Sequence, residues 1–166
     1  MISKGPRLVW FLCFSLLYAC SSPAPSVSAG PLAADAIQVF FSPNGGATEA
    51  VVSEIGNAKN KILVQAYSFT SAPIAKALLT AHKRGVKVTV VLDKSQRTAK
   101  YSSATFLSNV GIPTFIDDKH AIAHNKIIII DQATIITGSF NFTKAAEEKN
   151  AENLLVLKGA ANLLKK

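Results

Sequence analysis

The chain has 166 residues, of which 49% are hydrophobic and 17% charged, and its formal net charge is +8 at pH 7. Its two cysteines, Cys13 and Cys20, both lie near the amino terminus. The rest of the chain therefore cannot form a disulfide, which excludes a disulfide-stapled scaffold and leaves the hydrophobic core to stabilise the fold.

The amino terminus has the pattern of a secretory signal peptide. Lys4 and Arg7 precede an apolar stretch, residues 8–19, that is short for a membrane-spanning helix. The small residues that end at Ala29 predict cleavage there, so we interpret residues 1–29 as a signal peptide. The alternative is an uncleaved amino-terminal anchor. Both predict export, to the periplasm or the medium.

A second cleavage pattern competes with the first. Leu17-Tyr18-Ala19-Cys20 resembles a bacterial lipoprotein box, although Tyr18 fits that pattern poorly. The protein would meet the membrane only if Cys20 were lipidated. The Ser, Pro and Ala residues of the following segment, 21–31, predict a flexible tether in either case. Residues 30–166 then form one domain.

Strand and helix patterns alternate along that domain. Strands are predicted from β-branched, apolar runs and helices from the 3.6-residue period. We predict strands at residues 37–41, 61–67, 87–92, 114–116, 126–130, 134–137 and 153–157. We predict helices at residues 49–58, 72–84, 103–110 and 143–149. This alternation indicates an α/β fold with one core.

The segment from His124 to Asn141 places polar residues at the ends of two predicted strands. Side chains two positions apart on a strand share a face, so His124 and Lys126 should project together, with Asp131 on the opposite face. Ser139 and Asn141 likewise share a face where the second strand ends. The two strands are therefore expected to bring four polar side chains together.

These groups suit the cleavage of a phosphodiester without a metal. A neutral imidazole can attack phosphorus, while a lysine and an amide stabilise charge on the phosphate oxygens. The adjacent Asp117 and Asp118 are better interpreted as a solvated turn than as metal ligands. His120 lies four residues before His124, but the isoleucine run favours a strand over the helix that a zinc pair requires. We expect no metal and no cofactor.

The pattern His-x-Lys, four residues, Asp, six residues, Gly-Ser-x-Asn resembles the signature of the phospholipase D superfamily. It is filled here by His124, Lys126, Asp131, Gly138, Ser139 and Asn141. Downstream, Asn150-Ala151-Glu152 resembles the Asn-x-Glu element of that superfamily. The resemblance implies five catalytic residues: His124, Lys126, Ser139, Asn141 and Glu152.

The resemblance also assigns a role to each of these residues. His124 would be the nucleophile or the acid, and Glu152 would orient it. Lys126 and Asn141 would bind the phosphate, and Ser139 would assist. The remaining motif residues, Asp131 and Gly138, would be structural.

More narrowly, residues 66–70, 83–88 and 138–147 resemble the small bacterial, plasmid-type endonucleases of the superfamily. The likeness runs from about Ile37 to Leu157. It implies a phospholipase D-like sandwich, in which helices flank a mixed central β-sheet. The sequence departs from the pattern at its carboxy terminus, where those proteins continue into a longer helix. That departure bears on stability and activity more than on the fold.

The motif occurs once, whereas larger members of the superfamily carry two copies. Phosphohistidine chemistry needs one group to attack and another to protonate the leaving oxygen, so we predict a homodimer with one shared site. Residues 30–166 contain 16 basic and 10 acidic residues, which favours a nucleic acid substrate. The resemblance implies DNA before RNA. We therefore predict a metal-independent, non-specific endonuclease. The alternatives are a phospholipase D acting on lipid headgroups and a non-catalytic nucleic-acid-binding protein.

Overall fold

The computed structural model describes residues 36–99 and 102–164. The predicted signal peptide and Cys20 therefore lie outside the described residues. So does Lys100, one of the basic residues that flank the motif in the sequence.

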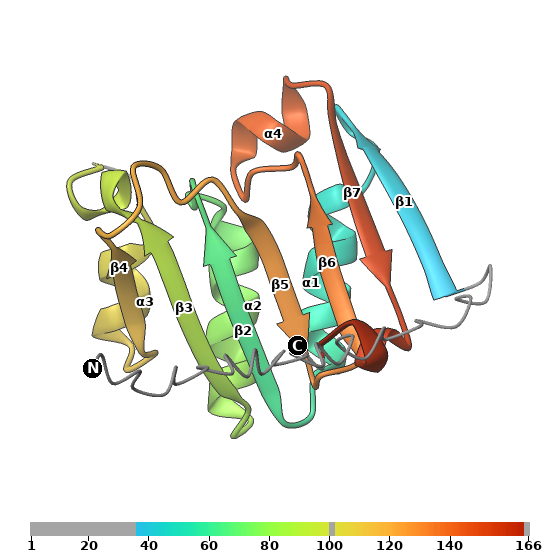
Figure 1. Ribbon diagram of the computed structural model, residues 1–166, viewed down its shortest axis with the longest axis horizontal. Coiled ribbons are helices and arrows are strands. Elements are labelled where there is room, and N and C mark those ends of the chain that lie inside the picture. Colours follow the sequence, from blue (N-terminus) through green and yellow to red (C-terminus); the bar gives the residue numbers. More distant parts are fainter. Residues whose placement is uncertain (1–35, 100–101, 165–166) are drawn as a thin grey trace, which may run out of the picture.

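A mixed sheet of seven strands forms the centre of the protein (Figure 1). The strands are β1 (Ile37–Ser42), β2 (Lys61–Ala66), β3 (Lys87–Asp93), β4 (Thr114–Asp117), β5 (Lys126–Ile130), β6 (Thr134–Gly138) and β7 (Glu152–Leu157). Their order across the sheet is β1-β7-β6-β5-β2-β3-β4. The β2, β3 and β4 strands are parallel neighbours, and the other pairs are antiparallel. The predicted α/β fold with a mixed sheet is confirmed.

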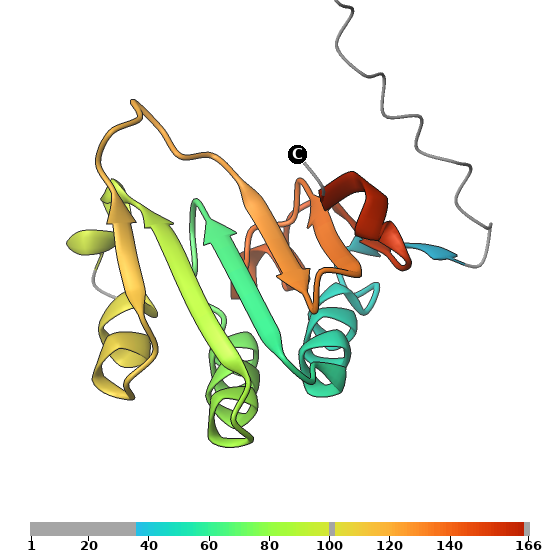
Figure 2. The same ribbon diagram turned by 60° about the horizontal axis from the view of Figure 1, so that its bottom comes forward.

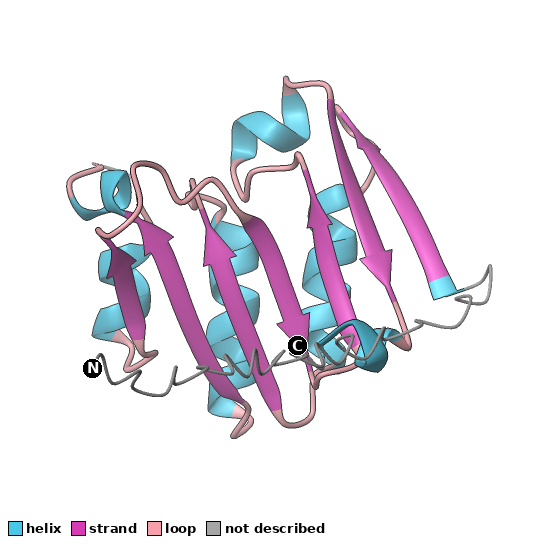
Figure 3. Ribbon diagram, in the orientation of Figure 1, coloured by secondary structure: helices cyan, strands magenta, loops and turns pink. Residues whose placement is uncertain are grey.

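Three helices cover one face of this sheet (Figures 2 and 3). They are α1 (Ala47–Asn57), α2 (Ala72–Lys83) and α3 (Ala104–Asn109), and a fourth helix, α4 (Lys144–Glu148), lies beyond the end of β6. Apolar side chains from α1 and α2 pack on alternate residues of the central strands. The core formed in this way includes Val51, Ile55, Ile74, Leu78, Ile62, Val64, Val90 and Ile128.

The opposite face of the sheet is more open. It carries the strand side chains that alternate with those in the core. Among them, Leu63, Ile127 and Ile129 are half-buried. On the outer strand β1, Val39 and Phe41 are 49% and 66% exposed. The 3-10 helix η3 (Ala160–Leu164) lies on this side, where the Ala160 N–H donates to the Ala133 carbonyl.

The carboxyl ends of α1 and α2 lie close together and are capped by one arginine. Gly85 follows α2 with a φ of +92°, a conformation that glycine adopts without strain and that commonly ends a helix. The Arg84 guanidinium donates to the carbonyls of Ile55, Gly56 and Ala58 at 3.2, 3.0 and 3.4 Å. The last carbonyls of a helix lack partners within it, and Arg84 supplies donors to them; the Ile55 carbonyl also accepts from the Ala58 N–H at 3.3 Å.

Asp131 begins the tight turn between β5 and β6, with φ values of +52° for Asp131 and +57° for Gln132. The Ala133 N–H donates to the Ile130 carbonyl at 3.0 Å across this pair, and left-handed residues at the centre of such a turn match the twist of the flanking strands. The Asp131 carboxylate accepts hydrogen bonds from the N–H groups of Lys59, Asn60 and Lys61, each at 2.8 Å. It therefore joins this turn to the connection between α1 and β2.

Most predicted elements differ from the observed ones by one or two residues at their ends. The 3-10 helices η2 (Lys94–Arg97) and η3 were not predicted. The side chain of Asp93 accepts from the Ser95 N–H at 2.9 Å and so begins η2. Helices this short have no hydrophobic period to detect.

Asp131→Asn should lower the free energy of unfolding at pH 7 by about 1–2 kcal/mol, because hydrogen bonds to a charged acceptor are the stronger kind. Burial raises the pKa of Asp131, but the three backbone N–H groups lower it more, so the pKa lies below its ordinary value. The stabilisation is therefore present above the unfolded-state pKa and is lost as the pH falls through the folded-state pKa. Urea unfolding at pH 7, 5 and 3 measures both effects.

The matched control is Asp118→Asn, which removes an exposed carboxylate 3.4 Å from Arg97 and should change stability by less than about 0.5 kcal/mol. Equal stabilities of Asp131→Asn and wild type at pH 7 would contradict the assigned role.

Candidate active site

Polar residues gather at one end of the sheet, where β2, β3 and β6 end and β5 and β7 begin (Figure 1). We call this the site end. In sheets with parallel strands, ligands bind at the carboxyl ends of those strands. In this sheet, the start of β5 and the end of β6, which belong to antiparallel strands, also lie at the site end.

His124 and Lys126 project together, as the strand periodicity predicts. Lys126 is the first residue of β5 and is only 7% exposed, whereas His124 is exposed in the irregular segment before it. The Lys126 Nζ lies 3.0 Å from His124 Nε2 and donates to the His124 carbonyl at 2.9 Å. A charged lysine donates in this contact, which requires Nε2 to be the acceptor.

The charge of Lys126 is the main electrostatic feature of the site. Burial lowers the pKa of Lys126, and the carboxylate of Glu152 opposes part of that shift. A positive charge held away from water attracts an anion more strongly than an exposed lysine does.

Ser139 and Asn141 follow a glycine that no other residue can replace without distortion. Gly138 has a φ of +144°, and a Cβ there would lie 2.3 Å from the Asn153 carbonyl oxygen. That carbonyl accepts from the N–H groups of Ser139 and Phe140, both at 3.1 Å. The Ser139 hydroxyl accepts in turn from the Asn153 N–H at 3.0 Å. The β6 end is thus bound closely to β7.

All five residues predicted to be catalytic line one open cavity of about 520 Å³. Its lining consists of His124, Lys126, Gly138, Ser139, Asn141 and Glu152. The Oδ1 atom of Asn141 is buried there without a hydrogen-bond partner. The structure therefore brings together residues that are up to 28 positions apart in the sequence, from His124 to Glu152. Asp131 lies at the opposite end of β5 and does not line the cavity.

Glu152 lies in the cavity, but its hydrogen bond goes to a different residue from the one predicted. Its Oε1 accepts from the Asn150 Nδ2 at 3.1 Å. Among the described residues, no hydrogen bond joins Glu152 to His124. The orienting role of Glu152 therefore stays a prediction, and the Glu152 carboxylate acts to raise the pKa of Lys126.

Three residues near the site were missed by sequence reasoning. The ring of Tyr67 lies against that of His124, with the centroids 4.5 Å apart. The buried carboxylate of Asp93 accepts from the Ala123 N–H at 2.8 Å and so fixes the residue before His124. Asn153 binds Ser139 as described above. These contacts join segments that are distant in the sequence, so a local sequence pattern does not predict them.

His120 and Asp117, which lie outside the cavity, pair with each other. His120 Nδ1 lies 2.8 Å from Asp117 Oδ2, and this contact is the main reason why the pKa of Asp117 lies below its ordinary value. Within residues 36–99 and 102–164, no three His, Cys, Asp or Glu side chains are grouped so that they could hold a metal ion. Across these same residues, no helix has the length and apolar character needed to cross a membrane.

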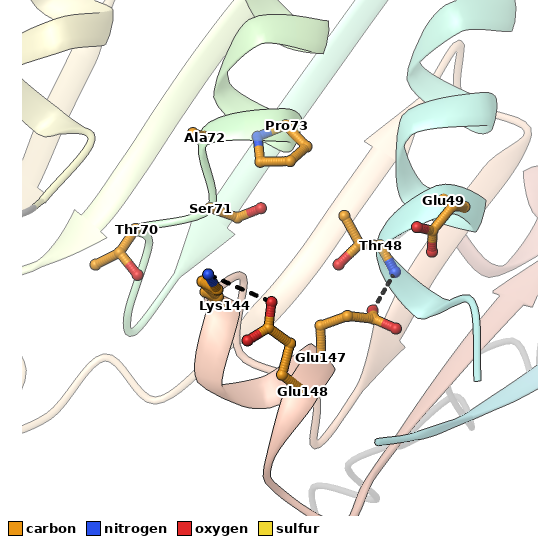
Figure 4. A pocket seen from close by; sticks show the side chains of 9 residues that line it. All are labelled: Thr48, Glu49, Thr70, Ser71, Ala72, Pro73, Lys144, Glu147 and Glu148. Carbon is orange, nitrogen blue, oxygen red and sulfur yellow. Dashed lines mark hydrogen bonds and ion pairs between the residues drawn. The ribbon is translucent and has the colours of Figure 1, made fainter. Parts of the chain in front are cut away.

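A second cavity, of about 420 Å³, lies where the amino ends of α1 and α2 meet α4 (Figure 4). There the Glu147 carboxylate accepts from the Thr48 N–H at 2.7 Å, and the Glu147 carbonyl accepts from the Asn44 N–H at 2.7 Å. Lys144 and Glu148 pair at 3.5 Å. The segment after Asn141 is thereby attached to α1, which gives Glu147 a structural role.

Comparison with known proteins gives consistent matches. Residues 51–166 match the family described as "Cardiolipin synthase, PLD-like domain". A protein named phospholipase D from Rickettsia felis is 43% identical over 121 residues, which are 73% of this chain and 60% of the relative. The chain thus spans about 60% of the length of that curated relative.

Two solved structures are also similar. One is a phospholipase D family member, Nuc, from Salmonella typhimurium, with 46% identity and a TM-score of 0.74 over 78% of this chain and 86% of that one. The other is NucT from Helicobacter pylori, with 27% identity and a TM-score of 0.68 over 77% and 87% of the two chains.

Gly138→Ala should lower the free energy of unfolding by about 1–3 kcal/mol, because the new Cβ meets backbone atoms of β7 and the φ of +144° strains any other residue. Chemical unfolding measures the loss, and the amide NMR signals of Ser139 and Asn141 should move. The matched control is Gly56→Ala in α1, where a Cβ has open space and should be neutral or stabilise by up to about 1 kcal/mol. Similar effects of both substitutions would contradict this account of Gly138.

Proposed function

Because the chain belongs to the phospholipase D superfamily, we propose that it is a phosphodiesterase, and more narrowly an endonuclease that cleaves DNA without a metal. The observation that carries the proposal is the shared cavity, in which His124 Nε2 lies 3.0 Å from the Nζ of the buried Lys126. An attacking nitrogen and a cation for the phosphate are thereby supplied by the chain itself.

Binding of the phosphate is the first step. A phosphate oxygen enters beside Lys126 and Asn141 and takes the hydrogen bond that Lys126 Nζ gives to His124 Nε2 in the free protein. The lone pair of Nε2 is then free to attack. The substrate thus converts the resting pair into a nucleophile and a separate phosphate ligand.

The chemical steps are two displacements at phosphorus. His124 Nε2 attacks, the P–N bond forms, the bond to the leaving oxygen breaks, and a protonated imidazole gives that oxygen its proton. In the second displacement water attacks phosphorus. It gives a proton to the second imidazole, which became neutral when it protonated the leaving oxygen. The P–N bond breaks, which restores His124 and releases a phosphomonoester.

The second imidazole comes from a second copy of the chain in this proposal. Among the residues that line the cavity, His124 is the single histidine, and the motif occurs once in the sequence. A two-fold axis beside the open cavity would place two identical motifs at one phosphate. The active form is therefore a homodimer.

DNA is the proposed substrate because the domain is basic and resembles the small bacterial endonucleases of the family. Two basic side chains lie close to the segment before His124: Lys94 donates to the His120 carbonyl at 3.2 Å, and Arg97 pairs with Asp118. Cationic groups of this kind bind the phosphates of any sequence. We propose little sequence preference and export to the periplasm or medium.

A phospholipid is the second candidate substrate. The Rickettsia felis relative is named phospholipase D, and the chemistry at phosphorus is the same for a lipid headgroup. Release of choline from phosphatidylcholine vesicles, without cleavage of DNA, would select this alternative.

His124→Ala should reduce cleavage of supercoiled plasmid and of single-stranded DNA by at least about 10³-fold in excess chelator, because the nucleophile is lost. Gel assays of residues 30–166 measure the rate. His82→Gln, a substitution at a half-buried histidine of α2 outside the cavity, is the control and should keep the wild-type rate. Loss of wild-type cleavage in chelator would contradict the metal-independent mechanism.

A heterodimer with one His124→Ala subunit tests the shared site. It should retain no more than about 1% of the wild-type rate, because each turnover needs both imidazoles and a general acid contributes about 10²-fold or more. Two different affinity tags allow the mixed dimer to be purified. Half of the wild-type rate would mean two independent sites, and a fully active monomer in sedimentation would exclude the dimer.

A further inference from the structure

The imidazole of His124 has few contacts that fix its direction. His124 belongs to an irregular segment and is exposed. Its ring has one hydrogen bond among the described contacts, to Lys126 Nζ, and that bond must break when a phosphate takes the lysine. Something other than Lys126 must then keep Nε2 aimed at phosphorus.

Tyr67 supplies a rigid surface beside this imidazole. The two ring centroids are 4.5 Å apart and the ring planes are inclined by 58°. Tilted aromatic pairs at this separation attract one another beyond the effect of their buried area. The contact involves no proton and no charge on His124, so binding of a phosphate to Lys126 does not remove it.

The backbone holds Tyr67 in register with the motif. Tyr67 is the residue after β2, and its N–H donates to the Asn125 carbonyl at 2.8 Å. This bond continues the ladder in which Ala66 pairs with Lys126. The tyrosine is therefore placed by the sheet itself, opposite the residue between His124 and Lys126.

The same ring also faces the lysine. The Lys126 Nζ lies 5.1 Å from the centroid of Tyr67, within the range of a cation–π interaction. The Tyr67 ring thus lies close to both groups that act on the phosphate. Among the described contacts, the Tyr67 hydroxyl makes no hydrogen bond, so the ring is the part that acts.

We propose that Tyr67 is a positioning residue, whose ring holds the His124 imidazole and the Lys126 ammonium in the geometry for attack on phosphorus. This inference rests on the proposed function of the cavity. It assigns a role in catalysis to a residue outside the motif, through contacts rather than through a bond to the substrate.

Removal of the ring should affect turnover more than binding. The phosphate keeps Lys126 and Asn141, so KM for a short single-stranded DNA should stay within about 3-fold of wild type. The imidazole can rotate away from phosphorus, and a misplacement of about 1 Å costs on the order of 10²-fold. Tyr67→Leu should therefore lower kcat by about 10- to 100-fold.

The experiment compares Tyr67→Phe, Tyr67→Leu and two controls in kcat, KM, unfolding free energy and NMR signals of the His124 ring protons. Tyr67→Phe should keep kcat within about 3-fold of wild type. Phe115→Leu removes an exposed aromatic ring from β4 and should match wild type. Phe69→Leu damages a fully buried ring two residues beyond Tyr67 and reports general destabilisation.

The His124 ring protons should shift in Tyr67→Leu and not in Tyr67→Phe, because the neighbouring ring current is lost only in the former. Wild-type kcat in Tyr67→Leu, or an equal loss in Phe69→Leu at matched stability, would overturn the positioning role. If the wild type cleaves no phosphodiester, the proposed function fails. The NMR comparison then tests the contact between Tyr67 and His124 without an activity assay. Unchanged His124 signals in Tyr67→Leu would overturn the inference.

Discussion

The antiparallel pairing of β5 with β2 joins the two halves of the sheet, and the position of the polar groups in the cavity depends on it. On one side lie the parallel strands β3 and β4, and on the other the antiparallel strands β6, β7 and β1. The register from Ile62–Ile130 to Ala66–Lys126 places Lys126 at the site end. The next hydrogen bond of the ladder, from Tyr67 to Asn125, extends this order to the segment that carries His124.

Chemical reactivity in this site comes with a cost in stability. Lys126 is nearly excluded from water, and its charge is compensated by a carbonyl, the His124 imidazole, an aromatic face and the nearby Glu152. The Asn141 Oδ1 is buried without a partner, which costs about 1–3 kcal/mol. Both features destabilise the free protein. An anion that accepts from Lys126 relieves the first, whereas Asn141 Oδ1 is itself an acceptor and is relieved only by a donor. The hydrophobic core between the sheet and its helices supplies the compensating stability.

Local periodicity predicted much of the fold and the composition of the cavity. The isoleucine run defined β5 from Lys126 to Ile130, and the two-residue parity put His124 beside Lys126. Parity could not predict that Tyr67 would face His124 or that Asp93 would fix Ala123, because these contacts depend on sheet order and on loops between distant strands. The hydrogen bond from Asn150 to Glu152, two residues apart, was also not predicted, and the orienting role of Glu152 stays a prediction. A spacing motif gives the members of a site but not their hydrogen bonds.

The functions of the residues at its two ends fix the length of β5. Lys126 begins it inside the cavity, and Asp131 follows it where its carboxylate binds three backbone N–H groups. The four isoleucines between them can be replaced by other β-branched residues with a small loss of stability, since such substitutions change only the packing. One inserted or deleted residue would rotate one end onto the wrong face and misplace the lysine or the aspartate. The identity of the residues in β5 can therefore vary, whereas their number cannot. Insertions and deletions are expected in the surface loops instead.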